Sequence, residues 1–138
     1  MPVEKRRVLL VDDDEVLLGL GRVMLTRLGY EVVTCTRSTD ALETFAAAPE
    51  RFDLVVTDYT MPSLTGEQLV VACRHLRPDL PALLYTGWLE VPEAGHDPAL
   101  GRMAVLQKPF SLHELDGALR QLLGAQQTEE GAVRAGIA

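Results

Sequence analysis

Short apolar runs recur along the chain and alternate with longer polar-apolar segments. The first run, VLLV, is continuous, and three aspartates end it at once. Such runs are typical of strands that are buried on both faces, as in a parallel sheet. The segments that this pattern predicts as strands are residues 8–11, 31–35, 52–57, 82–85 and 105–106.

Between these segments, apolar residues recur every three or four positions, which is the spacing of one helix face. Gly29 is typical of a residue that ends a helix. Ser38 is the expected cap of the second helix, and Ser111 with Glu114 forms a capping box for the last. Segment 87–103 holds three glycines and two prolines, which predicts a short or mobile helix. The other predicted helices span residues 15–28, 38–48, 65–76 and 111–123.

This alternation of strand and helix predicts an α/β fold, with a doubly wound, five-stranded parallel sheet and helices on both faces. The 138 residues suit one domain, and a hydrophobic content of 47% suits a packed core. We place the domain at residues 7–124, with an N-terminal flank at 1–6. Residues 125–138 lack apolar periodicity and are interpreted as a tail or linker.

The net charge narrows the classes of partner. A formal charge of -7 argues against direct binding of nucleic acid or anionic membranes by this chain, because an acidic surface repels phosphate groups. No apolar run approaches the roughly 18 residues that a membrane span needs. Aspartates interrupt the first apolar run, so it does not resemble a secretory signal. We therefore expect a cytoplasmic protein.

Polar side chains that can bind a ligand or take part in a reaction follow four of the predicted strands. They are Asp12 and Asp13 after the first, Asp58 after the third, Thr86 after the fourth and Lys108 after the fifth. In an open α/β sheet, ligands bind outside the carboxyl ends of the strands. The sequence therefore predicts that these carboxylates, the hydroxyl and the amine converge at one edge of the sheet.

This set of side chains suits phosphoryl transfer with a divalent cation. Like charges held close together repel, and a cation relieves that repulsion. Mg2+ prefers oxygen ligands and keeps several waters, which suits a small carboxylate cluster. Asp58 would attack phosphorus as a carboxylate nucleophile and form an acyl phosphate. Lys108 would neutralise phosphoryl charge, and the Thr86 hydroxyl would donate to a phosphoryl oxygen.

Each residue alone also has a structural interpretation. The aspartates at 12–14 can cap the first helix, as Asp14 is placed to do. Asp58 can be a loop residue, Thr86 a β-favouring strand residue and Lys108 a solvated lysine. These structural interpretations are nearly independent of one another. Chance therefore poorly explains why all of these residues fall at strand ends of one short chain.

Four motifs together resemble the receiver domain of two-component response regulators. They are VLLVDDDE at 8–15, DLVVTDYTMPSLTG at 53–66, LLYTG at 83–87 and LQKPF at 106–110. The resemblance covers about residues 7–123 and implies a flavodoxin-like fold with strand order 2-1-3-4-5. It also implies a phosphoacceptor signalling domain that catalyses only its own phosphorylation and dephosphorylation, not an enzyme in the usual sense.

The resemblance assigns roles to matching residues. Asp58 matches the phosphoacceptor, which also contacts the metal. Asp12 and Asp13 match the acidic pair that binds Mg2+, with Asp13 as a direct ligand. The backbone carbonyl of Thr60 matches a further metal ligand, and Lys108 matches the lysine that binds the phosphoryl group.

The resemblance also implies a conformational switch. Thr86 matches the hydroxyl residue that responds to phosphorylation, and Pro109 matches a proline that the family usually holds in a cis peptide. Val105 stands where the family often has an aromatic side chain that swings inward. We therefore expect Thr86, Lys108 and the segment 87–106, which contains the single tryptophan, to carry the signal.

Two other functions share parts of this pattern. Haloacid-dehalogenase-type phosphatases use a strand-end aspartate, but they carry a second aspartate two residues later, where this chain has Thr60. A pseudo-receiver would be a phosphorylation-independent interaction module, marked by loss of the acceptor, the acidic pair or the lysine. The expected partners are a sensor histidine kinase or phosphotransfer protein as phosphodonor, and a downstream protein or fused output domain.

Overall fold

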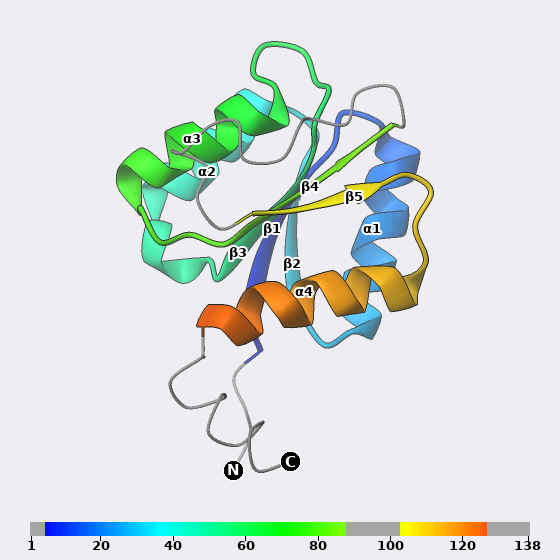
Figure 1. The fold of residues 1–138 in the computed structure, drawn as a ribbon. Coiled ribbons are helices and arrows are strands. Elements are labelled where there is room, and N and C mark those ends of the chain that lie inside the picture. The colour runs from blue at the N-terminus through cyan, green and yellow to red at the C-terminus, as the bar shows by residue number, and fades with distance from the viewer. Residues whose placement is uncertain (1–4, 88–102, 127–138) are drawn as a thin grey trace.

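A parallel sheet of five strands lies at the centre of the computed structural model, which describes residues 5–87 and 103–126. The strand order is β2-β1-β3-β4-β5, as predicted (Figure 1). The fifth strand is longer than the predicted 105–106, because its first residues pair with Ala82 and Leu83 of its neighbour. The strands are β1 (Arg7–Val11), β2 (Glu31–Cys35), β3 (Leu54–Asp58), β4 (Ala82–Thr86) and β5 (Met103–Gln107).

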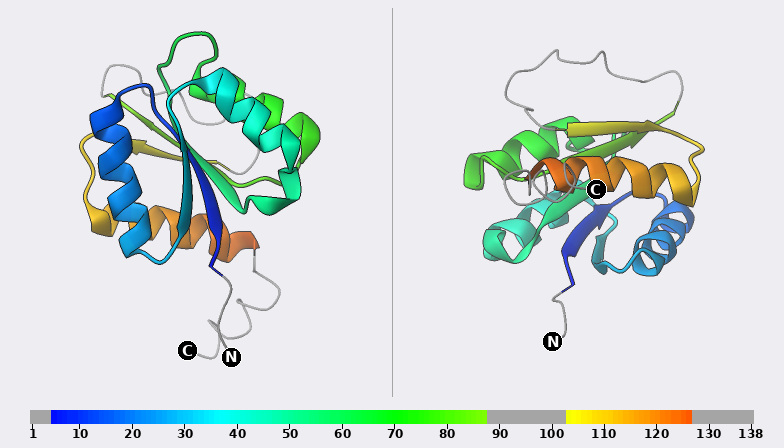
Figure 2. Two further views of the ribbon diagram at one scale, coloured as in Figure 1. Left: turned by 180° about the vertical axis from the view of Figure 1, so that it is seen from behind. Right: turned by 60° about the horizontal axis from the view of Figure 1, so that its bottom comes forward.

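Helices cover both faces of the sheet. Figures 1 and 2 show α1 and α4 on one face and α2 and α3 on the other. They are α1 (Glu15–Arg27), α2 (Ser38–Ala47), α3 (Gly66–Leu76) and α4 (Leu112–Gln126), and a 3-10 turn, η1 (Pro49–Arg51), follows α2. The short helix predicted between β4 and β5 and the single tryptophan lie outside the described residues. Among the residues described, no helix is both long and apolar enough to cross a membrane.

Local capping explains several helix ends. The Asp14 carboxylate accepts hydrogen bonds from two backbone N–H groups in the first turn of α1. Ser111 and Glu114 form the predicted capping box of α4, with bonds of 2.8 and 3.0 Å. After α1, Gly29 has a φ of 99°, a left-handed conformation that glycine adopts without steric cost.

The predicted cap of α2 is wrong. α2 begins at Ser38, but Arg37 holds the cap position and makes no capping hydrogen bond through its side chain. The Ser38 hydroxyl donates to the Pro62 carbonyl (3.1 Å) and accepts from the Leu64 N–H (3.1 Å). A long-range contact therefore replaces local capping, and α2 holds the loop that follows Asp58.

Each face of the sheet buries its own apolar layer, because successive strand residues point to opposite faces. Leu9 and Val11 pack with α2 and α3, whereas Val8 and Leu10 pack with α1 and α4. Burial of one such side chain stabilises the fold by about 1.5–3 kcal/mol. The buried sheet residues of this second layer, called here the α1/α4 layer, are Val8, Leu10, Leu54, Val56, Leu83 and Tyr85.

The same alternation continues into the polar ends of the strands. Asp12 lies two positions after Leu10, and Asp58 lies two positions after Val56, the residue paired with Leu10. Tyr85 is paired with Asp58 and belongs to the α1/α4 layer. The period of the strands therefore places Asp12, Asp58 and Tyr85 on the same side of the sheet, next to one another.

Candidate functional site

Three carboxylates meet at the carboxyl ends of β1 and β3. Asp12 and Asp13 follow β1, and Asp58 is the last residue of β3. One oxygen from each lies within 4.8 Å of the others; Asp12 and Asp58 are buried, and Asp13 is exposed. The structure thus brings together the three carboxylates that the sequence places at strand ends.

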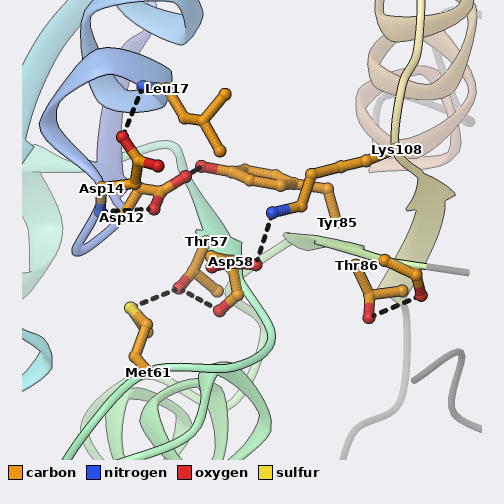
Figure 3. A network of polar contacts seen from close by, with 10 residues as sticks. Asp12, Asp14, Leu17, Thr57, Asp58, Met61, Tyr85, Thr86 and Lys108 are labelled. Carbon is orange, nitrogen blue, oxygen red and sulfur yellow. Dashed lines mark hydrogen bonds and ion pairs between the residues drawn. The ribbon is translucent and has the colours of Figure 1, made fainter. Parts of the chain in front are cut away.

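Asp12 is fully buried, and both of its carboxylate oxygens accept hydrogen bonds. Oδ1 accepts from the backbone N–H of Asp14 (2.9 Å), and Oδ2 accepts from the Tyr85 hydroxyl (2.6 Å; Figure 3). Burial, reinforced by the Asp12 carboxylate, raises the pKa of Tyr85, so the phenol stays protonated at neutral pH and its O–H donates the hydrogen bond to Asp12. Tyr85 is not among the predicted site residues. Its pairing with Asp58 in neighbouring strands is the feature that could have identified it.

Asp58 is paired with Lys108, whose Nζ lies 3.3 Å from Oδ1. Burial raises the pKa of the Asp58 carboxyl, and the negative charge of Asp12 raises it further, while Lys108 opposes both effects. Without a metal, the ionised carboxylate is therefore held at a cost in free energy. Added positive charge at this site would relieve that cost.

Lys108 reaches the acidic cluster from the loop after β5. Its backbone N–H donates to the Thr86 carbonyl (2.8 Å), and the Lys108–Pro109 peptide is cis, as the resemblance implies. The Lys108 Nζ also lies 5.4 Å from the centre of the Tyr85 ring. Figure 3 shows the ammonium between that ring and the Asp58 carboxylate.

The two threonines predicted for the site differ in exposure. Thr86 ends β4 and is fully buried, and its hydroxyl donates to the Gly87 carbonyl (3.3 Å). Figure 3 shows Thr86 apart from the pair formed by Asp58 and Lys108. Thr60 is exposed in the loop after β3, and the metal-binding role of its carbonyl stays a prediction.

The loop after Asp58 is fixed by close backbone contacts. The Thr57 hydroxyl donates to the Asp58 carbonyl (3.0 Å), and the Gly66 N–H donates to the Tyr59 carbonyl (2.7 Å). A Cβ atom on Gly66 would lie 2.2 Å from the Asp58 carbonyl oxygen and 2.8 Å from Leu84 Cδ2. Glycine therefore lets the first turn of α3 approach the backbone that carries Asp58.

The donor set fits Mg2+. The ion takes oxygen ligands at about 2.1 Å, so carboxylate oxygens within 4.8 Å of one another can share one ion directly or through its waters. The exposed Asp13 leaves the cluster accessible, and Lys108 forms an ion pair with Asp58 alone among the three acids. Asp12, Asp13 and Asp58 would hold the ion, which would supply the missing positive charge.

We expect the metal-free protein to lose stability relative to an Asp58→Asn variant as the pH rises. Because the pKa of Asp58 is raised, the folded protein binds this proton more tightly than the unfolded chain does. Wild-type stability therefore falls, relative to the variant, as the pH rises from the ordinary carboxyl pKa of 3.8 through the raised folded value. Thermal unfolding in EDTA at several pH values checks this, and parallel curves for the two proteins would contradict it.

Known proteins resemble this chain along most of its length. A model of the response regulator receiver domain matches residues 8–120. The response regulator MprA of Mycolicibacterium vanbaalenii is 39% identical over 137 residues, which cover 96% of this chain and 55% of that protein. The sensor kinase CckA of Brucella abortus is 34% identical over 120 residues, which cover 86% of this chain and 13% of the kinase. The chain thus spans about half or less of these relatives.

Solved structures share the fold. A response regulator receiver domain protein from Clostridium thermocellum has a TM-score of 0.81 at 25% identity, covering 88% of this chain and 97% of that one. The chemotaxis protein CheY4 of Vibrio cholerae has a TM-score of 0.76 at 30% identity, covering 86% and 99%. Sequence match, strand order and an acidic edge of the sheet agree, and the chain therefore belongs to the family of response regulator receiver domains.

Proposed function

We propose that this receiver domain accepts one phosphoryl group on Asp58 in a Mg2+-dependent reaction. The observation that carries the proposal is the placement of the Asp58 carboxylate, 3.3 Å from Lys108 Nζ and clustered with Asp12 and Asp13. A buried carboxylate with a raised pKa, flanked by a cation, is typical of a functional site. Because the acceptor, the acidic pair and the lysine all occur together, nothing in the described site favours a pseudo-receiver.

In the proposed reaction, a carboxylate oxygen of Asp58 attacks phosphorus while the bond from phosphorus to the donor breaks. The donor leaves with the electron pair of that bond, and Asp58 becomes an acyl phosphate. The Lys108 ammonium already lies at the carboxylate and would hold an oxygen of the incoming group. Mg2+ on the acidic cluster would supply further positive charge against the phosphoryl oxygens.

The Thr86 hydroxyl is proposed to change partner when Asp58 is phosphorylated. Its bond to the Gly87 carbonyl is 3.3 Å, longer than the roughly 2.7 Å typical of hydroxyl donors, so little is lost when it turns to a phosphoryl oxygen. Residues 87–106 follow directly and would transmit the change. Val105 is 37% exposed and offers no buried ring for the switch.

A sensor histidine kinase or a phosphotransfer protein is the proposed phosphodonor, and α1 offers a surface for it. Val16, Leu20 and Val23 recur at helical spacing and are 79%, 55% and 55% exposed. Exposed apolar patches are typical of protein interaction sites. This one begins at Val16 in the first turn of α1, three residues after Asp13.

The proposed output is a downstream protein or a fused domain, in the cytoplasm. The regulators and the kinase that the chain matches are longer than it, which is compatible with either arrangement. We propose residues 7–124 as the domain, with 1–6 as a flank and 125–138 as a tail or linker. Because α4 ends at Gln126, this linker would begin in the last turn of the helix.

Incubation with acetyl phosphate and Mg2+ tests the proposed function. We expect one phosphoryl group per chain by intact mass, none in EDTA, and release of the group by hydroxylamine, because hydroxylamine attacks acyl phosphates and spares phosphate esters. A label that resists hydroxylamine, or equal labelling with and without Mg2+, would contradict the proposed chemistry.

A further inference from the structure

Tyr85 lies between two groups that the proposed reaction uses. Its hydroxyl donates to Asp12 Oδ2 over 2.6 Å, and the Lys108 Nζ lies 5.4 Å from the centre of its ring. Figure 3 shows the ring extending from β4 toward Asp12, with the Lys108 ammonium beside it. One side chain thus contacts both Asp12 of the acidic pair and Lys108, the proposed phosphoryl-binding lysine.

The position of Tyr85 follows from the sheet. Tyr85 is paired with Asp58 on one side and with Leu106 on the other. Lys108 lies two residues after Leu106, so strand alternation places it on the same side of the sheet as Tyr85. The side chain is therefore aimed at the acidic edge by register, from a strand that is hydrogen-bonded on both sides.

Core packing explains only part of this arrangement. The Tyr85 ring packs in the α1/α4 layer against Phe110, with ring centres 5.6 Å apart, and phenylalanine would fill that space equally well. The hydroxyl adds a bond to a carboxylate that is fully buried. A buried carboxylate oxygen without a donor carries a large penalty, so the hydroxyl acts on Asp12 rather than on the core.

We propose that Tyr85 is a positioning residue whose hydroxyl orients the Asp12 carboxylate for Mg2+ and whose ring places the Lys108 ammonium at Asp58. The proposal rests on the Mg2+-dependent function proposed above. It gives Tyr85 two separable roles, one for the hydroxyl at Asp12 and one for the ring at Lys108. Outer partners that orient metal-binding carboxylates commonly change metal affinity 10- to 100-fold when removed. A cation beside an aromatic face gains a smaller, electrostatic stabilisation.

Two substitutions separate the role of the Tyr85 hydroxyl from the role of its ring. Tyr85→Phe removes the hydroxyl and keeps the ring, whereas Tyr85→Leu removes both. Tyr30→Phe is the matched control, because Tyr30 is a half-buried tyrosine packed against the same apolar layer, away from the acidic cluster. Mg2+ affinity is measured by calorimetric titration of each folded protein, and phosphorylation by acetyl phosphate is followed at saturating Mg2+.

For Tyr85→Phe we expect the Mg2+ dissociation constant to rise about tenfold, with an unchanged phosphorylation rate once Mg2+ saturates. For Tyr85→Leu we expect the same loss of affinity and, in addition, a rate about threefold lower at saturating Mg2+, because Lys108 loses the ring. Tyr30→Phe should match wild type in both measurements. A merely structural role would lower thermal stability without this division between affinity and rate.

The outcomes distinguish this inference from the proposed function. If Tyr85→Phe binds Mg2+ as tightly as wild type or more tightly, the positioning role is overturned while phosphorylation of Asp58 can stand. A Tyr85→Leu protein with the wild-type saturated rate would overturn the role of the ring. If wild type binds Mg2+ but takes no phosphoryl group, the proposed function fails, and the titrations still decide whether Tyr85 orients Asp12.

Discussion

An Asp58→Asn variant is expected to take up no phosphoryl group from acetyl phosphate and Mg2+ under conditions that fully label the wild type. Asparagine keeps the size and shape of the side chain, but its amide is a far weaker nucleophile than a carboxylate. The substitution also removes the ion pair with Lys108, which is 3.3 Å long. The loss of labelling therefore has a chemical cause and needs no change in fold.

The measurement is intact mass after a fixed incubation, with thermal unfolding to confirm that the variant is folded. Asp40→Asn is the matched control, because Asp40 is an exposed carboxylate in the first turn of α2, outside the acidic cluster. It should label like wild type. Equal labelling of Asp58→Asn and wild type would move the acceptor to another carboxylate, with Asp12 and Asp13 the first candidates.

Most residues of the candidate site could be predicted from the sequence because they lie at strand ends, whose position depends on topology. In a parallel sheet, residues that follow neighbouring strands meet at one edge, whatever the loops do. Asp12, Asp13 and Asp58 follow β1 and β3, which are paired, and they meet within 4.8 Å. Lys108 follows β5, which is not adjacent to β3, yet its long side chain spans β4 to reach Asp58.

The contacts that were not predicted depend on tertiary structure. The sequence places Tyr85 at the end of the strand predicted over residues 82–85, and only the pairing of β3 with β4 shows that its hydroxyl can reach Asp12. Ser38 has the local signature of a helix cap, but its hydroxyl bonds the loop after β3 because that loop packs beside α2. Local patterns predict which elements form, and register determines which polar atoms meet.

Gly66 makes a further tertiary contact that local sequence patterns do not predict, and this contact affects stability. The sequence places Gly66 at the start of the helix predicted over residues 65–76, and the structure adds that it lies where the first turn of α3 meets the Asp58 carbonyl. The Gly66 N–H donates to the Tyr59 carbonyl (2.7 Å), so the two backbones are held together at this point. The phosphoacceptor strand and α3 are therefore coupled through a residue that carries no side chain.

Gly66→Ala is expected to destabilise the fold by about 3 kcal/mol, and to lower the melting temperature by roughly 10 °C. The added Cβ would lie 2.2 Å from the Asp58 carbonyl oxygen and 3.0 Å from its carbon, and backbone atoms cannot rotate away as a flexible side chain can. Urea or thermal unfolding measures the change in the free energy of unfolding.

Gly117→Ala is the matched control for this substitution. Gly117 lies in α4, and a Cβ atom there would meet nothing within 4 Å. Because alanine is the better helix former, this variant should be more stable than wild type by up to about 1 kcal/mol. The two substitutions add the same methyl group, so opposite signs would show that the effect at Gly66 comes from its close contacts with the Asp58 backbone and Leu84. A Gly66→Ala protein as stable as wild type would mean that α3 can shift away from β3 without cost.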